Sequence, residues 1–527
     1  MKMKKFAALA AATIMTVSAV AATSAFSVFA TTENANKIVI TDNVDGKTYV
    51  AYPIFNQTSA TNTIEWADGF TGDSFIDALK NDTTFGNKFD TVSTAADVAS
   101  VISKKDNWTE EETAAFAKVA AKFVSNGTTS TYANGQYTLN VTNAGYYLII
   151  DTTTNTGKDN ANSAYILNVS GKTTVTPKVG KPTLTKEIKH NEENTWGVVG
   201  DNQIGDDVEF RITTTIPSEV QYYDKYTYTI HDQLSEGFDL PDNAECFFYD
   251  KNGAKLTSVT FTPVISKNPT DNSFAIQFNI KDLLAQNPDI AKIETYYSAK
   301  LNGNAKVADK ATNSTDNNPN TAYLTYSNNP QDESGKEDGK TPESKVYDWT
   351  FTLVGNKIDG QTGDRLAGAQ FQLKDETGNV LKLVATGTKN EYRIATGSDT
   401  ATIDTITTDD QGVFYIKGID DSVKYTLVEA KAPDEYNKAS DTKFWLNTKD
   451  GDDIGYSIDG GTLNRLQIAK GDYSDKDANV GLTIENNKGG KLPSTGGIGT
   501  QIFYGVGGAI VVGAGVLLIT KKRAKKD

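Results

Sequence analysis

Short segments in which β-branched and aromatic residues alternate with polar ones recur along most of the chain. Examples are GQYTLNVTNAGYYLIID, YTYTIHDQL, TAYLTYSNNP, DWTFTLVGNKID and KYTLVEAKAP, and Gly, Asn, Asp or Pro residues bound them. Segments of this kind are typical of half-buried strands joined by turns, and their regular spacing favours β-sandwiches. We therefore predict a mainly β chain made of tandem immunoglobulin-like sandwich domains.

The first third of the chain adds a helical pattern to the strands. In TEEETAAFAKVAAKFVSNG, Thr109 and Glu112 have the spacing of a capping box, and Phe116, Val119 and Phe123 follow at helical spacing. SFIDALKND is a weaker second helix. We expect both helices to cover one face of an N-terminal sheet.

The two ends of the sequence predict export and a surface location. Residues 1–30 combine a lysine-rich start, an apolar run and small residues before a cleavage point after Ala30, which is the pattern of a secretory signal peptide. Residues 502–520 form an apolar run long enough to span a membrane, and a cluster of Lys and Arg follows it. The positive-inside rule keeps that cluster in the cytoplasm, so the bulk of the chain lies outside the cell.

Composition excludes several function classes. The formal net charge of −15 disfavours nucleic acid as a partner, because phosphates would be repelled. Cys246 is the only cysteine, so no intramolecular disulfide can form. The two histidines lack zinc-ligand spacing, and no phosphate-binding loop or nucleophile elbow is present. We expect no metal, no cofactor and no enzymatic activity.

Two polar segments divide the mature chain. Roughly 460 residues remain without the ends, which predicts about three domains. The segments TVTPKVGKPT and NNPQDESGKEDGKTPESK, the latter at 328–345, are rich in Pro, Gly and charge, as linkers are. The predicted domains therefore span 31–178, 179–345 and 346–490, with a terminal segment at 491–527.

The terminal segment carries a motif with a defined chemistry. The pentapeptide is LPSTG, formed by Leu492, Pro493, Ser494, Thr495 and Gly496, and the apolar run and basic tail follow it. This three-part arrangement resembles the cell-wall sorting signal of Gram-positive surface proteins. The resemblance implies that a sortase cuts between Thr495 and Gly496, and that an amine then attacks the resulting thioester.

A lysine-rich stretch at the first predicted boundary offers such an amine. In TTVTPKVGKPTLTKEI, the tetrapeptide VTPK resembles the pilin motif of sortase-assembled major pilins, which implies that Lys178 joins Thr495 of the next subunit. Pro177 keeps the segment out of a central strand because it lacks an N–H donor. Lys181 is the nearest competitor, and an ordinary solvated lysine is the alternative reading.

The third predicted domain places three reactive side chains on inward-facing strand positions. Strand alternation aligns Lys357, Glu429 and Asn486 each with an apolar face, whereas Asn487 points outward. The motifs VGNKIDGQTGDRLAGAQFQL, YTLVEAKAPDEYN and LTIENNKGG resemble the Cna-B type domain. That resemblance implies an isopeptide bond from Lys357 to Asn486, promoted by Glu429; an ordinary Lys357–Glu429 ion pair is the alternative.

The middle predicted domain resembles the fimbrial isopeptide-forming D2 domain through KPTLTKEI, YTYTIHDQLSEGF and NTAYLTYSNNP. The resemblance implies a bond from Lys186 to Asn328, promoted by Asp232. Asn320 has the same strand parity as Asn328 and remains an alternative. No comparable set is recognisable in the first domain.

These resemblances together predict a major pilin, the shaft subunit of a pilus anchored covalently to the cell wall and supporting adhesion. The expected partners are a class C pilin sortase, identical subunits, accessory pilins and peptidoglycan, with an unknown host ligand. The alternative is a monomeric wall-anchored adhesin or an accessory pilin, which would need no acceptor at Lys178.

Overall fold

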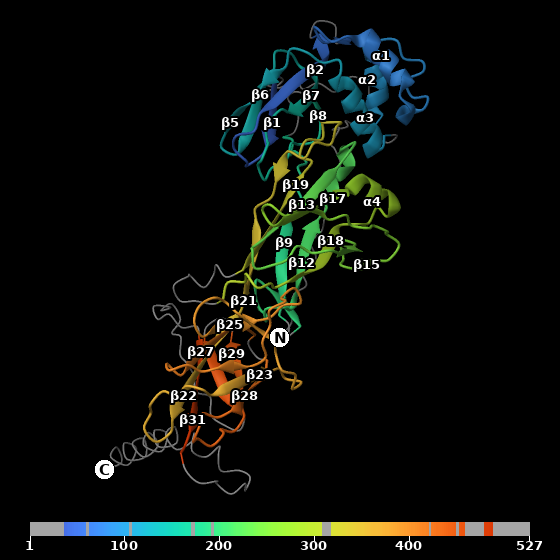
Figure 1. Cartoon of the computed structure of the whole chain (residues 1–527). Helices are drawn as coiled ribbons and strands as arrows, with labels where there is room; N and C mark the ends of the chain where they lie inside the picture. The colour runs from blue at the N-terminus through green and yellow to red at the C-terminus, as the bar shows by residue number, and fades with distance from the viewer. Residues whose placement is uncertain are drawn as a thin grey trace, which may run out of the picture.

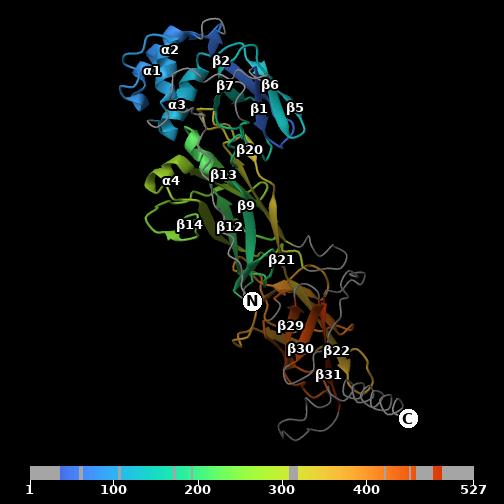
Figure 2. The ribbon, with the colours of Figure 1, turned by 180° about the vertical axis from the view of Figure 1, so that it is seen from behind.

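The computed structural model describes residues 36–58, 63–104, 108–169, 174–190, 194–307, 318–420, 423–449, 453–458 and 479–488. The predicted signal peptide and sorting signal lie outside these ranges. The described residues form three units that follow one another along an elongated molecule, with the long helices gathered in the first unit (Figures 1 and 2). The fold is mainly β, as predicted.

The N-terminal unit has three layers, which are helices, a five-stranded sheet and a three-stranded sheet. The five-stranded sheet contains β2 (Tyr49–Thr58), β3 (Thr63–Trp66), β4 (Thr128–Thr129), β7 (Gly145–Asp151) and β8 (Ile166–Val169). The three-stranded sheet contains β1 (Lys37–Thr41), β5 (Thr131–Ala133) and β6 (Gln136–Asn140). The helices are α1 (Gly72–Asn81), η1 (Thr83–Phe85), α2 (Ala95–Ser103) and α3 (Glu110–Ala121).

Strand alternation explains these layers. In β7, Tyr146 and Leu148 pack against the helices, whereas Tyr147 and Ile149 pack against the three-stranded sheet. The capping box of α3 is confirmed, because the Glu112 carboxylate accepts from Thr109 N at 2.9 Å. The predicted second helix is α1.

Helix α2 was not predicted. It is short, and its capping box uses Asp97 in place of the usual Glu or Gln: the Asp97 carboxylate accepts from Thr94 N at 2.9 Å.

The middle unit is a sandwich of two sheets. One sheet contains β9 (Leu184–His190), β10 (Thr195–Gly197), β12 (Asp207–Thr215), β14 (Ala244–Tyr249), β15 (Lys255–Leu256) and β18 (Lys292–Lys300). The other contains β11 (Val199–Asp201), β13 (Thr227–Leu234), β16 (Ser266–Asn268), β17 (Ser273–Asn279), β19 (Pro319–Tyr326), β20 (Gly339–Lys340) and β21 (Ser344–Trp349). Two short helices, η3 (Ser218–Tyr222) and α4 (Ile280–Gln286), complete the unit.

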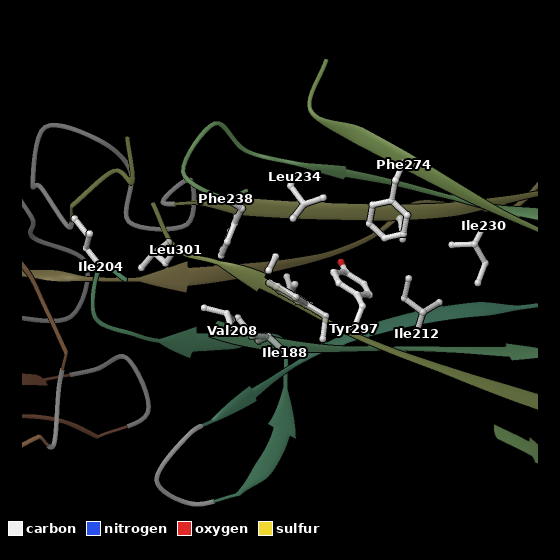
Figure 3. Close-up of a cluster of buried hydrophobic side chains, with 14 of the residues drawn as sticks. Ile188, Ile204, Val208, Ile212, Ile230, Leu234, Phe238, Phe274, Tyr297 and Leu301 are labelled. Atoms are coloured by element: carbon white, nitrogen blue, oxygen red, sulfur yellow. The ribbon is translucent and has the colours of Figure 1, made fainter. Parts of the chain in front are cut away.

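The core of the middle unit lies between its two sheets. Ile188 and Ile212 come from one sheet, and Ile230 and Phe274 from the other. Tyr297 of β18 lies among them, with its hydroxyl in the layer between the sheets (Figure 3). A polar atom so deeply buried needs hydrogen-bond partners, and it marks the part of the core where polar groups gather.

The third unit is also a two-sheet sandwich. Its first sheet contains β22 (Phe351–Asp359), β24 (Leu383–Ala385), β25 (Glu391–Ile394), β27 (Val413–Ile419) and β31 (Asn479–Asn486). Its second contains β23 (Gln370–Lys374), β26 (Ile406–Thr407), β28 (Tyr425–Lys431), β29 (Thr442–Lys449) and β30 (Asp453–Ile458). The first and last strands, β22 and β31, are parallel neighbours.

The predicted boundary at residue 345 is wrong. Strand β21 pairs with β19 and β11, so the middle unit continues to Trp349. The polar segment 328–345 also does more than link two domains. Asn162 N donates to Asn328 O at 2.7 Å, and Gln331 Nε2 donates to Ser163 O at 2.8 Å. Asn328 and Gln331 of this segment thus bind the backbone of the N-terminal unit.

The middle and third units share a packed junction. Ile204 N donates to Gly418 O at 3.0 Å, and Tyr425 Oη donates to Gln203 Oε1 at 3.0 Å. Gly418 has φ +88°, and a Cβ there would lie 2.5 Å from Ile204 Cδ1, so only glycine fits this close approach. One continuous cluster of buried apolar side chains crosses this junction.

Candidate functional site

The middle unit buries a lysine between its sheets. Leu184, Lys186 and Ile188 alternate with more exposed residues along β9, so the pattern that buries the two apolar side chains also buries the Lys186 ammonium group. The Nζ atom of Lys186 donates to Asp232 Oδ2 and, at 2.6 Å, to Tyr297 Oη. The rings of Phe210 and Tyr297 have their centroids 5.1 and 5.0 Å from Nζ.

Burial shifts both ionisable groups toward their neutral forms. Loss of water lowers the pKa of Lys186 to about 8, although the neighbouring Asp232 opposes the shift. Burial likewise raises the pKa of the Asp232 carboxyl above its ordinary value, and here Lys186 and Tyr297 oppose the shift. The site therefore favours a neutral amine beside a protonated acid more strongly than water does.

Tyr297 connects this pair to an asparagine. Its hydroxyl donates to Asp232 Oδ2 at 2.9 Å and accepts from Asn320 Nδ2 at 2.7 Å. Asn320 lies on β19, opposite Leu234, and is completely buried. Its Oδ1 and Asp232 Oδ1 are both buried without a hydrogen-bond partner among the described residues.

The assignment of Asn328 is not supported, because the structure does not bring it to Lys186. Asn328 lies beyond the end of β19, and its Nδ2 donates to Asn155 O at 3.1 Å and Asn160 O at 3.3 Å in the N-terminal unit. Tyr326 pairs with Tyr228, four residues from Asp232 along β13, so Asn328 lies further still from the acid. Asn320, the alternative left open by parity, is the asparagine near the buried pair.

The third unit contains a second buried set. Lys357 is completely buried on β22, and its Nζ donates to Ile358 O and Ile484 O, each at 3.1 Å. Asn486 on β31 lies opposite Asp359, two residues from Lys357 and on the same face. Its Nδ2 donates to Glu429 Oε2 at 3.0 Å.

The buried lysine of this second set resembles that of the first. Burial lowers the pKa of Lys357 to about 8, and the negative charge of Glu429 is the largest opposing influence. Glu429 Oε2 also accepts from Ala439 N at 2.6 Å. Glu429 Oε1 and Asn486 Oδ1 are buried without a partner in the described part of the chain. Asn487 is exposed, as its parity predicted.

A third buried lysine, in the N-terminal unit, was missed by the sequence analysis. Lys47 Nζ lies 3.1 Å from Asp151 Oδ2 and donates to Ala161 O at 2.7 Å. The neighbouring Asn162 differs from Asn320 and Asn486, because its Oδ1 accepts from Asn155 Nδ2 at 3.1 Å. Lys47 precedes its strand by two residues, so strand alternation gave no signal for it.

Lys178 lies where the N-terminal and middle units meet. Its Nζ donates to Tyr222 Oη at 2.8 Å and lies 3.8 Å from Glu110 Oε1, and about a quarter of its side chain (26%) is exposed. The competing Lys181 forms an ion pair with Asp159 and also donates to Asp159 O at 3.0 Å. Lys178 is thus a partly exposed amine that side chains of two units contact.

The predicted sorting motif, from Leu492 to Gly496, and the apolar run at 502–520 lie outside the described residues. No helix within the described ranges is long and apolar enough to cross a membrane. The same ranges hold no group of three or more His, Cys, Asp or Glu side chains suited to a metal ion.

Two family models match the sequence. Residues 351–462 match the SpaA family, a prealbumin-like fold domain, and residues 484–527 match the LPXTG cell wall anchor motif. These matches cover the third unit and the terminal segment that carries Thr495.

Individual proteins also resemble the chain. The trypsin-resistant surface T6 protein of Streptococcus pyogenes serotype M6 is 25% identical over 408 residues, which are 67% of this chain and 71% of that protein. The three-domain structure of the T6 backbone pilin from serotype M6 S. pyogenes superposes with a TM-score of 0.51 at 17% identity, covering 86% of this chain and 98% of the other. The major pilin SpaD of Corynebacterium diphtheriae gives a TM-score of 0.44 at 17% identity, with 86% and 98% covered.

These similarities involve structural proteins, not enzymes. The anchor motif covers the terminal segment, the prealbumin-like domain covers most of the third unit, and the similarity to the T6 protein extends over 67% of the chain. The chain thus carries an LPXTG cell wall anchor motif, resembles the T6 surface protein in sequence and resembles a backbone pilin in fold.

Proposed function

We propose that the chain is the shaft subunit of a covalent pilus, polymerised by a class C sortase that joins the carboxyl group of Thr495 to Nζ of Lys178 in the next copy. One feature supports Lys178 over Lys181 as the acceptor: Lys178 follows Pro177 in the VTPK motif. Accessory pilins and peptidoglycan are the further partners that this role implies.

We also propose two intramolecular amide bonds, one from Lys186 to Asn320 and one from Lys357 to Asn486. In each case the neutral amine attacks the side-chain carbonyl carbon of asparagine, the new C–N bond forms, and the old C–N bond breaks with loss of ammonia. Asp232 or Glu429, when protonated, donates a hydrogen bond to the asparagine and passes that proton to the leaving nitrogen. The resulting carboxylate then takes one proton from the attacking lysine nitrogen, which restores the acid as ammonia leaves. Burial favours the neutral forms of Lys186, Asp232 and Lys357. The folded strands hold the reacting groups together, so no external catalyst is needed.

One observation carries this proposal. Two consecutive units each bury a lysine, an acid and an asparagine together, and in both units a carboxyl oxygen and the amide oxygen lack partners among the described residues. An uncompensated buried polar atom costs on the order of 1–3 kcal/mol, so a purely structural network would be expected to satisfy these atoms. Groups that react to form a new bond do not need these hydrogen-bond partners beforehand.

The polymer is tested by boiling cell-wall extracts in SDS detergent and separating them by size. We expect the parent to give a ladder of covalent multimers, and Lys178→Ala to collapse it to a single band while Lys181→Ala leaves it intact. A parent without a ladder would favour the monomeric adhesin or accessory role. A ladder that survives in Lys178→Ala would move the acceptor to another lysine.

A further inference from the structure

The contacts of Lys178 come from two different units. Glu110 is the first residue of α3 in the N-terminal unit, and Tyr222 is the last residue of η3 in the middle unit. Glu110 Oε1 lies 3.8 Å from Nζ of Lys178, and Tyr222 Oη lies 2.8 Å from the same atom. This Nζ atom is 5.4 Å from the centroid of the Tyr222 ring. Both contacts therefore exist together only while the two units are docked.

The backbone around Lys178 is held from both sides as well. Ala164 N of the N-terminal unit donates to Lys178 O at 3.3 Å. Gly180 presses against the middle unit so closely that a Cβ would lie 2.0 Å from Glu219 Oε2 and 2.8 Å from Pro217 Cβ. The position of the segment is thus set by the docked pair of units rather than by either alone.

Other charged groups lie around the same junction. Lys118 of α3 forms ion pairs with Asp224 and, at 3.5 Å, with Glu333, and Lys181 is paired with Asp159. Asn328 and Gln331, which follow β19, donate to the backbone of residues 155–163. These contacts dock the two units without touching Lys178.

We propose that Glu110 and Tyr222 are positioning residues for Lys178, and that docking of the N-terminal unit on the middle unit presents this amine for transfer. The inference rests on the proposed role of Lys178 as acceptor. Of the hydrogens on the neutral amine, one is held by Tyr222 Oη, which leaves the lone pair free to face an incoming acyl group.

The transfer step accounts for each proton. The lysine ammonium group loses one proton to solvent before attack, while Glu110 and Tyr222 hold the side chain in position. The neutral amine attacks the thioester carbonyl carbon that joins Thr495 of another copy to the sortase cysteine. The new C–N bond forms, the C–S bond breaks, and the departing thiolate takes the second proton from nitrogen.

The test uses the full mature chain as acceptor, with Thr495→Ala so that it cannot also act as donor. A fluorescent KLPSTGG peptide, copied from residues 491–497, is the donor, and the pilin sortase of the same cell is the enzyme. We expect Glu110→Gln and Tyr222→Phe each to lower kcat by about tenfold, with little change in the KM for the acceptor chain. The sortase still binds the chain, but the Lys178 amine is no longer held where it can attack the thioester. Glu111→Gln, on the next residue of α3, is the matched control and should keep the parental rate.

A variant remote from the amine tests docking itself. The double substitution Asn328→Ala with Gln331→Ala removes side-chain hydrogen bonds between the two units. It leaves Lys178, Glu110 and Tyr222 unsubstituted. We expect it to slow the sortase reaction, yet to make Lys178 more reactive toward a small acetylating reagent. Lys47, buried in the N-terminal unit, should stay unacetylated, which shows that the unit remains folded.

The outcomes separate the two proposals. If Lys178→Ala accepts the peptide as fast as the parent, the proposed acceptor is wrong. If Lys178→Ala is inactive but Glu110→Gln, Tyr222→Phe and the docking variant all react within about twofold of the parent, the acceptor stands and the positioning role is overturned.

Discussion

At the scale of single residues, the choice between two asparagines decides where the middle unit is cross-linked. Asn320 and Asn328 share a strand parity, and both are buried. They differ in their partners, because Asn320 reaches Asp232 through the Tyr297 hydroxyl and Asn328 binds the backbone of the N-terminal unit. Burial of Asn328 thus reflects docking of two units, not proximity to Lys186.

The asparagine choice can be checked by intact mass. We expect the measured mass of Asn320→Ala to fall short of its sequence mass by one ammonia less than the parent does, because no bond to Lys186 can form. Asn328→Ala should lose it as the parent does. Digestion into peptides identifies the bonded pair directly, and a Lys186–Asn328 cross-linked peptide would contradict the assignment.

The pH dependence of the middle bond follows from the coupled Lys186–Asp232 pair. The reactive form carries one proton in total, located on Asp232, because the amine must be neutral and the acid protonated. The pKa of about 8 for Lys186 marks loss of that last proton. At pH values below about 8, the pair keeps this one proton. It takes up a second proton only when the pH falls toward the pKa of Asp232, which burial raises.

We therefore expect the rate of bond formation to be level just below pH 8 and to fall as pH rises above about 8. Protein recovered unfolded and unbonded in denaturant, then diluted into a series of buffers spanning this pH, would report the rate through the appearance of the lighter mass. A rate that instead climbs through this range would mean that amine deprotonation alone limits the reaction and that Asp232 is not the acid.

At the scale of strands, alternation predicted most of the two sites. A period of two residues continues an apolar face onto Lys186, Asp232, Lys357, Glu429 and Asn486, and the structure buries all five. Alternation specifies the face of a sheet but not the position along it. The register of β13 with β19, which separates Asn320 from Asn328, depends on pairing between distant segments.

Other features had no periodic signal in the sequence. Lys47 and Asn162 lie outside strands, and the polar composition of 328–345 is equally compatible with solvent and with another domain's backbone. Strand β21, which begins at the end of that region, moved the domain boundary, because a short segment preceded by Pro and charged residues has the composition of a linker. Tertiary contacts determine each of these features.

The bond proposed in the third unit should stabilise it strongly. Lys357 and Asn486 lie on the parallel neighbours β22 and β31, so the bond closes a loop that contains nearly the whole unit. By analogy with a disulfide closing a loop of about 100 residues, we expect Asn486→Ala to lower the free energy of unfolding by about 4–5 kcal/mol. Pulse proteolysis of the full chain in increasing urea measures this loss within residues 351–488.

The exposed neighbour Asn487 provides the matched control for this measurement. Asn487→Ala should change the free energy of unfolding by no more than about 0.5 kcal/mol, as is usual for surface substitutions. The bond would be shown to be absent if Asn486→Ala and Asn487→Ala had equal urea midpoints and if their measured masses differed from their sequence masses by the same amount.

At the scale of the whole molecule, the proposed linkages define a path for pulling force. Force enters at Lys178, passes along β9 to Lys186, and crosses the Asn320 bond to β19. It then continues through β21 and β22 to Lys357, crosses to Asn486 on β31, and leaves toward Thr495. The strands of the N-terminal unit, which precede Lys178 in the chain, lie outside this path.

This path gives a mechanical prediction for the pilus. When a single filament is stretched, the parent should show no unfolding of the middle or third unit, because the bonds bypass the chain between their ends. Asp232→Ala should release about 130 residues between Lys186 and Asn320, which adds about 45 nm per subunit at about 3.5 Å per residue. Force spectroscopy of isolated filaments measures these steps, and Glu337→Ala, at a middle-unit carboxylate that accepts from Thr325 Oγ1 away from the buried pair, is the control. Steps of this length in the parent would mean that the folded strands carry the load and that the proposed bonds do not.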